Sequence, residues 1–221
     1  DHNAPLSDGD NWPRLVQVAW QLHDATGALV EARDDVVVPE GFTIPFNATK
    51  VHGITEAVAR KYGVPLAEAL ERFTEAVQQA DFVVGHNVKF DLNIMGAEYY
   101  SLGQQNPLEE KAYLDTSRET RDFCQLKGGK GGGYKIPKLE ELYEKLFDES
   151  FAEAHNAAAD VEATARAFLE AVRRKIFSDD HLDWTSEQRA AFEAAQPDTV
   201  PLAGIEVKSF KELAAQLASE E

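Results

Sequence analysis

The chain has 221 residues, of which 43 % are hydrophobic, so it is long enough and apolar enough to build the core of one ordinary domain. Its formal net charge of −17 argues against a basic face that grips duplex nucleic acid, but not against carboxylates that hold cations. No run approaches the roughly 18 apolar residues that cross a bilayer, and the single cysteine, Cys124, excludes an intrachain disulfide, so we expect a cytoplasmic protein without a membrane partner.

The first half of the chain predicts a hairpin followed by helices. Residues 14–23 alternate apolar and polar side chains, which is typical of a half-buried strand. The turn sequence 24–27 follows, and residues 29–38 predict the second strand. Apolar side chains then recur at spacings of four and three from residue 66 to residue 77, which predicts an amphipathic helix.

The second half alternates short strands with helices. Residues 81–85 predict a buried strand, and residues 87–102 predict a loop and a helix. A further strand is expected at residues 112–115, with another helix directly after it. Apolar stripes predict one helix that starts at Pro137 and one that contains residues 161–172. This alternation after a hairpin predicts an α/β fold with a mixed central sheet flanked by helices.

Two segments stand apart from this pattern. Residues 127–134 are rich in Gly and Lys and predict a surface loop, with a basic flap over a phosphate backbone as the alternative. Beyond Phe177 the pattern weakens and acids dominate. We therefore expect a main domain over residues 1–177 and an acidic C-terminal extension over residues 178–221, with one closing helix at its end.

The first cluster with chemical character is Gly85-His-Asn-Val-Lys-Phe-Asp91. It places a carboxylate where a helix begins, just after a buried strand. Carboxylates at strand ends are well placed to hold a hard cation such as Mg²⁺. The alternative for Asp91 is a helix N-cap, a position at which Asp is preferred.

The second cluster is His155-Asn-Ala-Ala-Ala-Asp160, which leads into the helix of residues 161–172. Five residues turn about 500° around an α-helix, so the two side chains cannot share a face if both are helical. If they act together, His155 lies in the preceding loop or the first turn, where it would suit a general base near neutral pH. The alternatives are an exposed loop histidine and an ordinary polar residue on a helix.

Together the clusters resemble motifs of the DEDDh family of 3′→5′ exonucleases, to which the proofreading subunit of bacterial DNA polymerase III belongs. Gly85 to Asp91 resembles the second exonuclease motif, and His155 to Asp160 resembles the third. Lys50-Val-His-Gly-Ile-Thr55 resembles the family's His-Gly-Ile-Thr segment, which lies beside the terminal nucleotide. Leu114-Asp-Thr116 and Pro137-Lys-Leu139 match further landmarks in the same order, and the resemblance covers residues 14–175.

The resemblance implies an RNase H-like fold and hydrolysis of the 3′-terminal phosphodiester with two Mg²⁺ or Mn²⁺ ions. Asp91 and Asp160 would bind metal, and His155 would take a proton from the attacking water. For Phe90, the alternative to contact with the substrate is a core residue at a helix start. The residues that would bind the substrate are His52, Gly53, Ile54, His86, Asn87 and Phe90.

One part of the family pattern is absent from this chain. The first motif, Asp-x-Glu on the opening strand, is expected just upstream of Trp12, and residues 1–10 do not contain it. That strand lies in the middle of the family's sheet, so we expect an exposed strand edge and the loss of two of four metal-binding carboxylates. The hypothesis is that the motif is encoded upstream, and that the chain as printed is not a competent nuclease.

These observations predict a metal-dependent 3′→5′ exonuclease for single-stranded or frayed DNA ends, in proofreading or repair, with a DNA polymerase subunit as a partner. An exoribonuclease of the same family is one alternative, because the choice of DNA or RNA depends on contacts near the 2′ position. A non-catalytic module that binds nucleic acid or a polymerase is the other, because the fold alone does not decide the activity.

Overall fold

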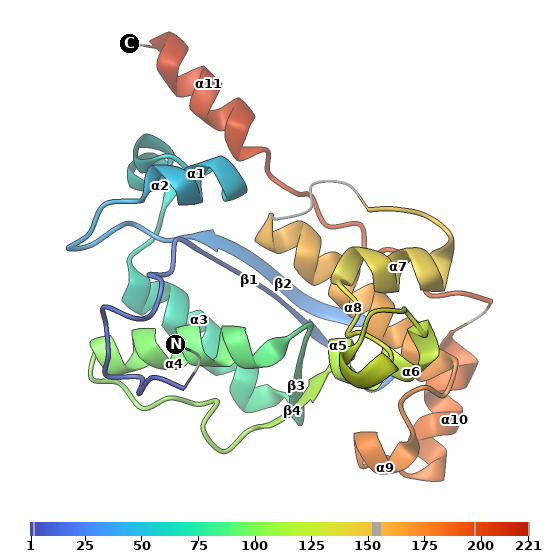
Figure 1. Ribbon diagram of the computed structural model, residues 1–221. Helices are drawn as coiled ribbons and strands as arrows, with labels where there is room; N and C mark the ends of the chain where they lie inside the picture. The colour runs from blue at the N-terminus through green and yellow to red at the C-terminus, as the bar shows by residue number, and fades with distance from the viewer. Residues whose placement is uncertain (2, 152–155, 197, 221) are drawn as a thin grey trace.

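The predicted hairpin lies at the centre of the molecule (Figure 1). The computed structural model describes residues 1, 3–151, 156–196 and 198–220. Strands β1 (Gln17–His23) and β2 (Leu29–Val36) pair antiparallel, from Gln17 opposite Val36 to His23 opposite Leu29. At the turn, Gly27 has a φ of 83°, a left-handed conformation that glycine adopts without the steric penalty of other residues.

A second, smaller pair of strands carries one side of the candidate site. Strands β3 (Phe82–Gly85) and β4 (Ala112–Asp115) are parallel, with Gly85 opposite Asp115. Parallel strands need a crossover connection, and helix α4 (Val88–Ser101) supplies most of it. Because Gly85 and Asp115 end their strands side by side, the turn after β3 lies next to the turn after β4.

The single mixed sheet that the sequence predicts is present as two separate halves. Among the described residues, β1 pairs with β2 and β3 pairs with β4, and no described strand joins one pair to the other. Side-chain packing holds the halves together instead. Trp20 of β1 and Val83 of β3 belong to one apolar cluster, and helix α8 (Ala157–Arg173) contacts both β1 and β3.

Helices cover both sides of the β1–β2 hairpin, with α3 (Leu66–Gln79) and α4 on one side and α7 (Leu139–Phe147) and α8 on the other (Figure 1). The helices predicted at residues 66–77, 87–102, 137 onward and 161–172 are confirmed as α3, α4, α7 and α8. In the described part of the chain, no helix is long and apolar enough to cross a membrane. The remaining helices are α1 (Phe46–His52), α2 (Glu56–Tyr62), α5 (Thr116–Glu119), α6 (Arg121–Cys124), α9 (Asp179–Leu182), α10 (Ser186–Ala195) and α11 (Phe210–Glu220).

The segment after Phe177 folds back onto the strands and helices. Leu182 of α9 and Phe192 of α10 are buried in one cluster with Phe177 and Phe168. The closing helix predicted from the sequence is confirmed as α11, but α9 and α10 were not predicted, because each presents too few apolar residues to form a recognisable stripe.

The last helix packs on the segment that contains Gly53 and Ile54. Phe210 is only 2 % exposed and shares an apolar cluster with Ile54 and Val58. The chain that leads to α11 is also fixed, because Asn156 Nδ2 donates to the carbonyl oxygen of Lys208 at 2.9 Å. Helix α11 therefore covers one flank of the candidate site.

Replacing Phe210 with Ala is expected to release α11 while most of the domain stays folded. Truncating a buried Phe costs about 3–5 kcal/mol, whereas an isolated helix this short is marginal in water. Amide hydrogen exchange should show at least about a tenfold loss of protection in α11, with Leu202→Ala at an exposed position as the control. A large fall in global stability with α11 still protected would contradict this expectation.

Candidate functional site

The turn between β3 and α4 presents Asp91. Asn87 has a φ of 62° and is the N-cap residue of α4, so Asp91 lies within the first turn of the helix. This answers one question left open by the sequence, because Asp91 is not the N-cap. Gly85 allows the tight turn, since a Cβ there would lie 2.7 Å from Val88 Cγ2. The backbone N–H of Asn87 donates to Asp115 Oδ1 at 2.9 Å, which fixes the turn against the end of β4.

The start of α8 presents Asp160. Asn156 is the N-cap, and its side chain accepts a hydrogen bond from Ala158 N at 3.1 Å. Asp160 is half-buried in the first turn of the helix. His155 lies outside the described residues, so its role as general base stays a prediction.

The fold brings Asp91 and Asp160 together, although 68 residues separate them in the sequence. The pKa of the Asp91 carboxyl is raised to about 6, mainly by the crowding of protein atoms around it, and the negative charges of Asp115 and Asp160 contribute in the same direction. Asp91 nevertheless keeps an exposed surface. A cation bound beside Asp91 would offset the repulsion among these negative charges and would stabilise the ionised carboxylate.

These carboxylates fit part of the metal site that the resemblance implies. Mg²⁺ is commonly held by one or two carboxylates, with water and substrate phosphates completing its shell. Asp91 and Asp160 match this number of protein ligands for one such ion. Within residues 1, 3–151, 156–196 and 198–220, no three His, Cys, Asp or Glu side chains are grouped to hold a metal, so the four-carboxylate site for two ions is not present there.

Asp115 is a part of the site, although in the sequence it was only a landmark of the family resemblance. Its side chain is 6 % exposed, and Oδ1 accepts hydrogen bonds from Asn87 N, Ser117 N and Ser117 Oγ. It is the N-cap of α5 and at the same time the support of the turn before α4. Asp followed by Thr and Ser at the end of a predicted strand is the sequence signal for this cap.

Two replacements should separate the charge of Asp115 from its hydrogen bonds. Asp115→Ala is expected to lower the free energy of unfolding by about 2–3 kcal/mol, because buried donors lose their acceptor. Asp115→Asn keeps an acceptor oxygen and should cost less than half as much. Because it also removes a negative charge near Asp91, carboxyl NMR should show a lower Asp91 pKa in Asp115→Asn. An unchanged pKa would mean that the charges are not coupled.

The segment predicted to meet the terminal nucleotide lies between α1 and α2. His52 Nδ1 accepts a hydrogen bond from Ile54 N at 3.0 Å, so the proton of the neutral ring is on Nε2. His52 Nε2 is buried without a hydrogen-bond partner among the described residues, and burial lowers the pKa of the ring. Ile54 is fully buried in the cluster with Phe210, so its side chain contributes packing to this segment.

The remaining predicted substrate residues surround the turn before α4. His86 bonds Thr116 Oγ1 through Nδ1 and the carbonyl oxygen of Pro137 through Nε2, each at 3.0 Å. Both ring nitrogens are therefore occupied, and His86 joins three segments of the site. Phe90 is 41 % exposed, which excludes the alternative of a core residue.

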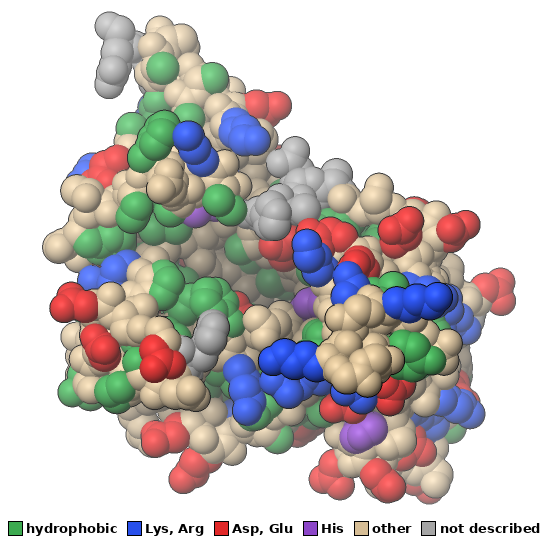
Figure 2. All heavy atoms as spheres, in the orientation of Figure 1, with side chains coloured by type: hydrophobic (Ala, Val, Ile, Leu, Met, Phe, Trp, Pro, Cys, Tyr) green, Lys and Arg blue, Asp and Glu red, His purple; other side chains and the backbone are tan. Residues whose placement is uncertain are grey.

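Figure 2 shows the face on which these elements meet. It is hollowed between the region of α1 and α2 and the region of α4, α5 and α7. Lys and Arg side chains gather beside the hollow, near α5 and the stretch that precedes α7. This local concentration contrasts with the net charge of −17.

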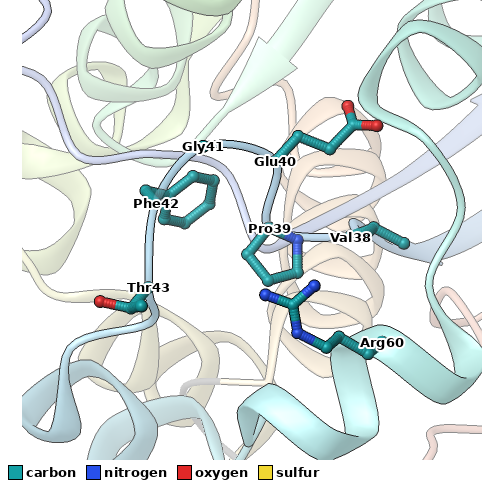
Figure 3. A pocket seen from close by; sticks show the side chains of 7 residues that line it. All are labelled: Val38, Pro39, Glu40, Gly41, Phe42, Thr43 and Arg60. Carbon is teal, nitrogen blue, oxygen red and sulfur yellow. The ribbon is translucent and has the colours of Figure 1, made fainter.

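A separate open pocket of about 640 Å³ lies at the segment that follows β2 (Figure 3). Its lining consists of the segment Val38 to Thr43 and Arg60. None of these residues is one of the predicted site residues. Arg60 also pairs with Glu56 at 2.6 Å.

Comparison with known families decides the wider assignment. The family model for the exonuclease domain RNase_T matches residues 21–168, about two thirds of the chain, and spans both Asp91 and Asp160. The chain belongs to this exonuclease family. The membership predicted from the motifs is thereby confirmed.

The exonuclease domain also resembles individual proteins. It is 30 % identical over 137 residues to the DNA polymerase III subunit epsilon-like protein of Rhodobacter capsulatus, covering 61 % of this chain and 18 % of that protein. It matches the structure of E. coli exonuclease I in complex with a dT13 oligonucleotide with a TM-score of 0.60 and 19 % identity, over 82 % of this chain and 40 % of that chain. The complex of E. coli exonuclease I with a dA16 oligonucleotide gives 0.60 and 21 %, over 76 % and 38 % of the two chains.

These likenesses confirm the α/β, RNase H-like fold. The exonuclease domain spans less than a fifth of the curated relative and about two fifths of the exonuclease I chains. Activities, substrates and partners of the whole protein are therefore proposals.

Proposed function

We propose that this domain is the catalytic part of a metal-dependent 3′→5′ exonuclease that removes nucleotides from single-stranded or frayed DNA ends. The observation that carries the proposal is the placement of Asp91 in the first turn of α4 and Asp160 in the first turn of α8 of an exonuclease-family fold, near enough for the charge of Asp160 to raise the pKa of Asp91. The oligonucleotides held by the two E. coli exonuclease I structures support DNA as the substrate. The epsilon-like relative supports a role in proofreading, with a polymerase subunit as the partner.

In the proposed reaction, water attacks the terminal phosphorus, and the bond from that phosphorus to the 3′-oxygen of the preceding nucleotide breaks. A divalent cation held by Asp91 and Asp160 would supply an activated water and compensate negative charge on the phosphate. His155 would take a proton from the attacking water, and the leaving 3′-oxygen would take a proton from solvent and depart as a hydroxyl. The segment of His52 and Gly53, with Asn87 and Phe90, would contact the terminal nucleotide.

The test is degradation of a 5′-labelled single strand by the full-length protein in Mg²⁺ or Mn²⁺. A ladder that shortens from the 3′ end, and that His155→Ala abolishes, would support the proposal. Parallel DNA and RNA strands would separate the deoxyribonuclease from the exoribonuclease. Shortening from the 5′ end, or internal cuts, would overturn it.

A non-catalytic binding module is the second candidate. It is favoured because no three His, Cys, Asp or Glu side chains in the described part of the chain are grouped so that they could hold a metal ion. In that case the full-length protein would bind a strand with a free 3′ end but leave it intact in either metal. The same experiment therefore separates the two candidates.

A further inference from the structure

Residues 126–135 form a short hairpin, which we call the basic hairpin. Lys127 pairs with Tyr134 as an antiparallel bridge, and Gly129 N donates to Gly133 O at 3.0 Å. Glycine makes this pairing possible, because a Cβ at Gly129 would lie 2.3 Å from Tyr134 O. The Gly-rich segment that the sequence predicts as a loop is thus a hydrogen-bonded structure with a fixed shape.

The basic hairpin concentrates positive charge in an acidic chain. Lys127, Lys130 and Lys135 lie on it, Lys138 follows it, and no acid occurs between residues 125 and 139. Lys135 pairs with Glu141 Oε1 at 2.5 Å. Lys127 and Lys130 are exposed and form no ion pair with a described residue, so both are available to a negatively charged ligand.

The base of the basic hairpin is attached to the candidate site. Pro137 is buried just beyond it, and its carbonyl oxygen accepts a hydrogen bond from His86 Nε2 at 3.0 Å. His86 belongs to the turn that leads into the helix of Asp91. The base of the basic hairpin is thus tied to the turn before the helix of Asp91, and Figure 2 shows Lys and Arg side chains beside the hollow on this face.

Exposed apolar side chains accompany these lysines. Tyr134 is 44 % exposed and Ile136 is 49 % exposed. Proteins that bind single strands combine cations that track the backbone with aromatic side chains on which bases stack. The combination on the basic hairpin matches a single strand better than a duplex, whose stacked bases offer no face to Tyr134.

We propose that the basic hairpin holds the sugar-phosphate backbone of a single nucleic-acid strand a few nucleotides behind its 3′ end. Lys127 and Lys130 contact phosphates and Tyr134 stacks on a base. The inference rests on the proposed function, because the strand runs from the hairpin to the carboxylates. It adds a second contact region that determines how long a strand must be for tight binding.

The experiment compares Lys127→Ser/Lys130→Ser with Lys61→Ser/Lys175→Ser, a matched pair of exposed lysines elsewhere. Anisotropy in EDTA would measure binding of the full-length proteins to fluorescent 4-mer and 20-mer single strands over a range of KCl. Each phosphate contact on a single strand contributes about 0.7 to the slope of log K against log salt. The hairpin variant should therefore lose about 1.4 of slope, and bind the 20-mer about 25-fold more weakly at 0.1 M KCl. The 4-mer should bind unchanged.

The outcomes separate the two proposals. If the unmodified protein binds neither strand in EDTA, the inference is overturned, whereas the proposed function, which needs the cation, is decided by the cleavage test. If the unmodified protein binds the 20-mer and the hairpin variant keeps the control's slope and affinity, the inference alone is overturned. A poly-glutamate of equal charge that displaces the 20-mer would also overturn it, by showing a general polyanion surface.

A Gly129→Ala variant tests the shape of the basic hairpin while keeping all of its lysines. The added Cβ would meet Tyr134 O, so the pairing across the hairpin should break. Binding of the 20-mer should weaken at least about fivefold, the effect of losing one stacked base. Unchanged binding would show that the lysines act without the hairpin, and would overturn the proposed contact geometry.

Discussion

Replacing Asp160 with Asn is expected to slow 3′-end degradation by the full-length protein at least about a thousand-fold. A metal ion that compensates transition-state charge contributes several kcal/mol, and each 1.36 kcal/mol is about tenfold in rate. Asp91→Asn should have a similar effect, because both carboxylates would hold the cation. The measurement is single-turnover cleavage of a labelled strand at saturating Mg²⁺. Activity within about tenfold of the unmodified protein would remove these residues from the metal site.

The Asp91→Asn variant also has a stability signature that misfolding would not give. The pKa of Asp91 is raised from 3.8 to about 6, so the folded state holds the proton more tightly than the unfolded state does. Stability is therefore lost as the pH rises from about 4 to about 6. Asn removes this penalty, so metal-free Asp91→Asn should melt at a higher temperature than the unmodified protein at pH 8. The expected increase is only about 2 °C, because exposure to water screens the charges. At pH 4 the difference should vanish. A lower melting temperature at pH 8 would contradict the charge coupling.

Replacing Glu170 with Gln is expected to give the largest loss of stability from a single charge, about 3 kcal/mol at pH 7. The Glu170 side chain is 0 % exposed and accepts hydrogen bonds from Arg173 and Arg174 at 2.7 Å and from Val200 N at 3.2 Å. Desolvation raises its pKa, but these hydrogen bonds outweigh desolvation and lower the pKa from 4.5 to about 2. The Gln side chain is neutral and has only one acceptor oxygen, so it cannot replace the charged hydrogen bonds that Glu170 forms with both guanidinium groups.

The sign of this effect sets its pH dependence. Because the pKa of Glu170 is lower in the folded state, its contribution is complete above about pH 4.5 and is lost as the pH falls toward 2. Urea unfolding of Glu170→Gln should therefore differ from the unmodified protein at pH 7 and converge with it near pH 2. The control is Glu144→Gln at an exposed position of α7, which should change stability by less than about 0.5 kcal/mol. A constant difference across this range would show that packing, not charge, is responsible.

Local pattern was sufficient for most of the secondary structure. The alternation in residues 14–23 predicted β1, and the turn at residues 24–27 predicted β2 after it. The apolar stripe from Leu66 to Val77 predicted α3, because one buried face imposes the repeat. The short helices α1, α2, α9 and α10 escaped prediction. Helices of this length depend on caps and tertiary contacts, as at Thr185, which accepts a hydrogen bond from Gln188 N.

In the candidate site too, some features follow from the local sequence and others only from the tertiary structure. The sequence by itself determined the family, through Gly85 to Asp91 and the segment that ends at Asp160, because a turn and a helix start place each carboxylate locally. Only the tertiary structure decided that the charges of Asp160 and Asp115 act on Asp91. It also decided that the sheet is in two halves and that α11 covers Ile54. These depend on contacts between segments far apart in the chain, and a periodic pattern reports which face of an element is buried but not which partner buries it.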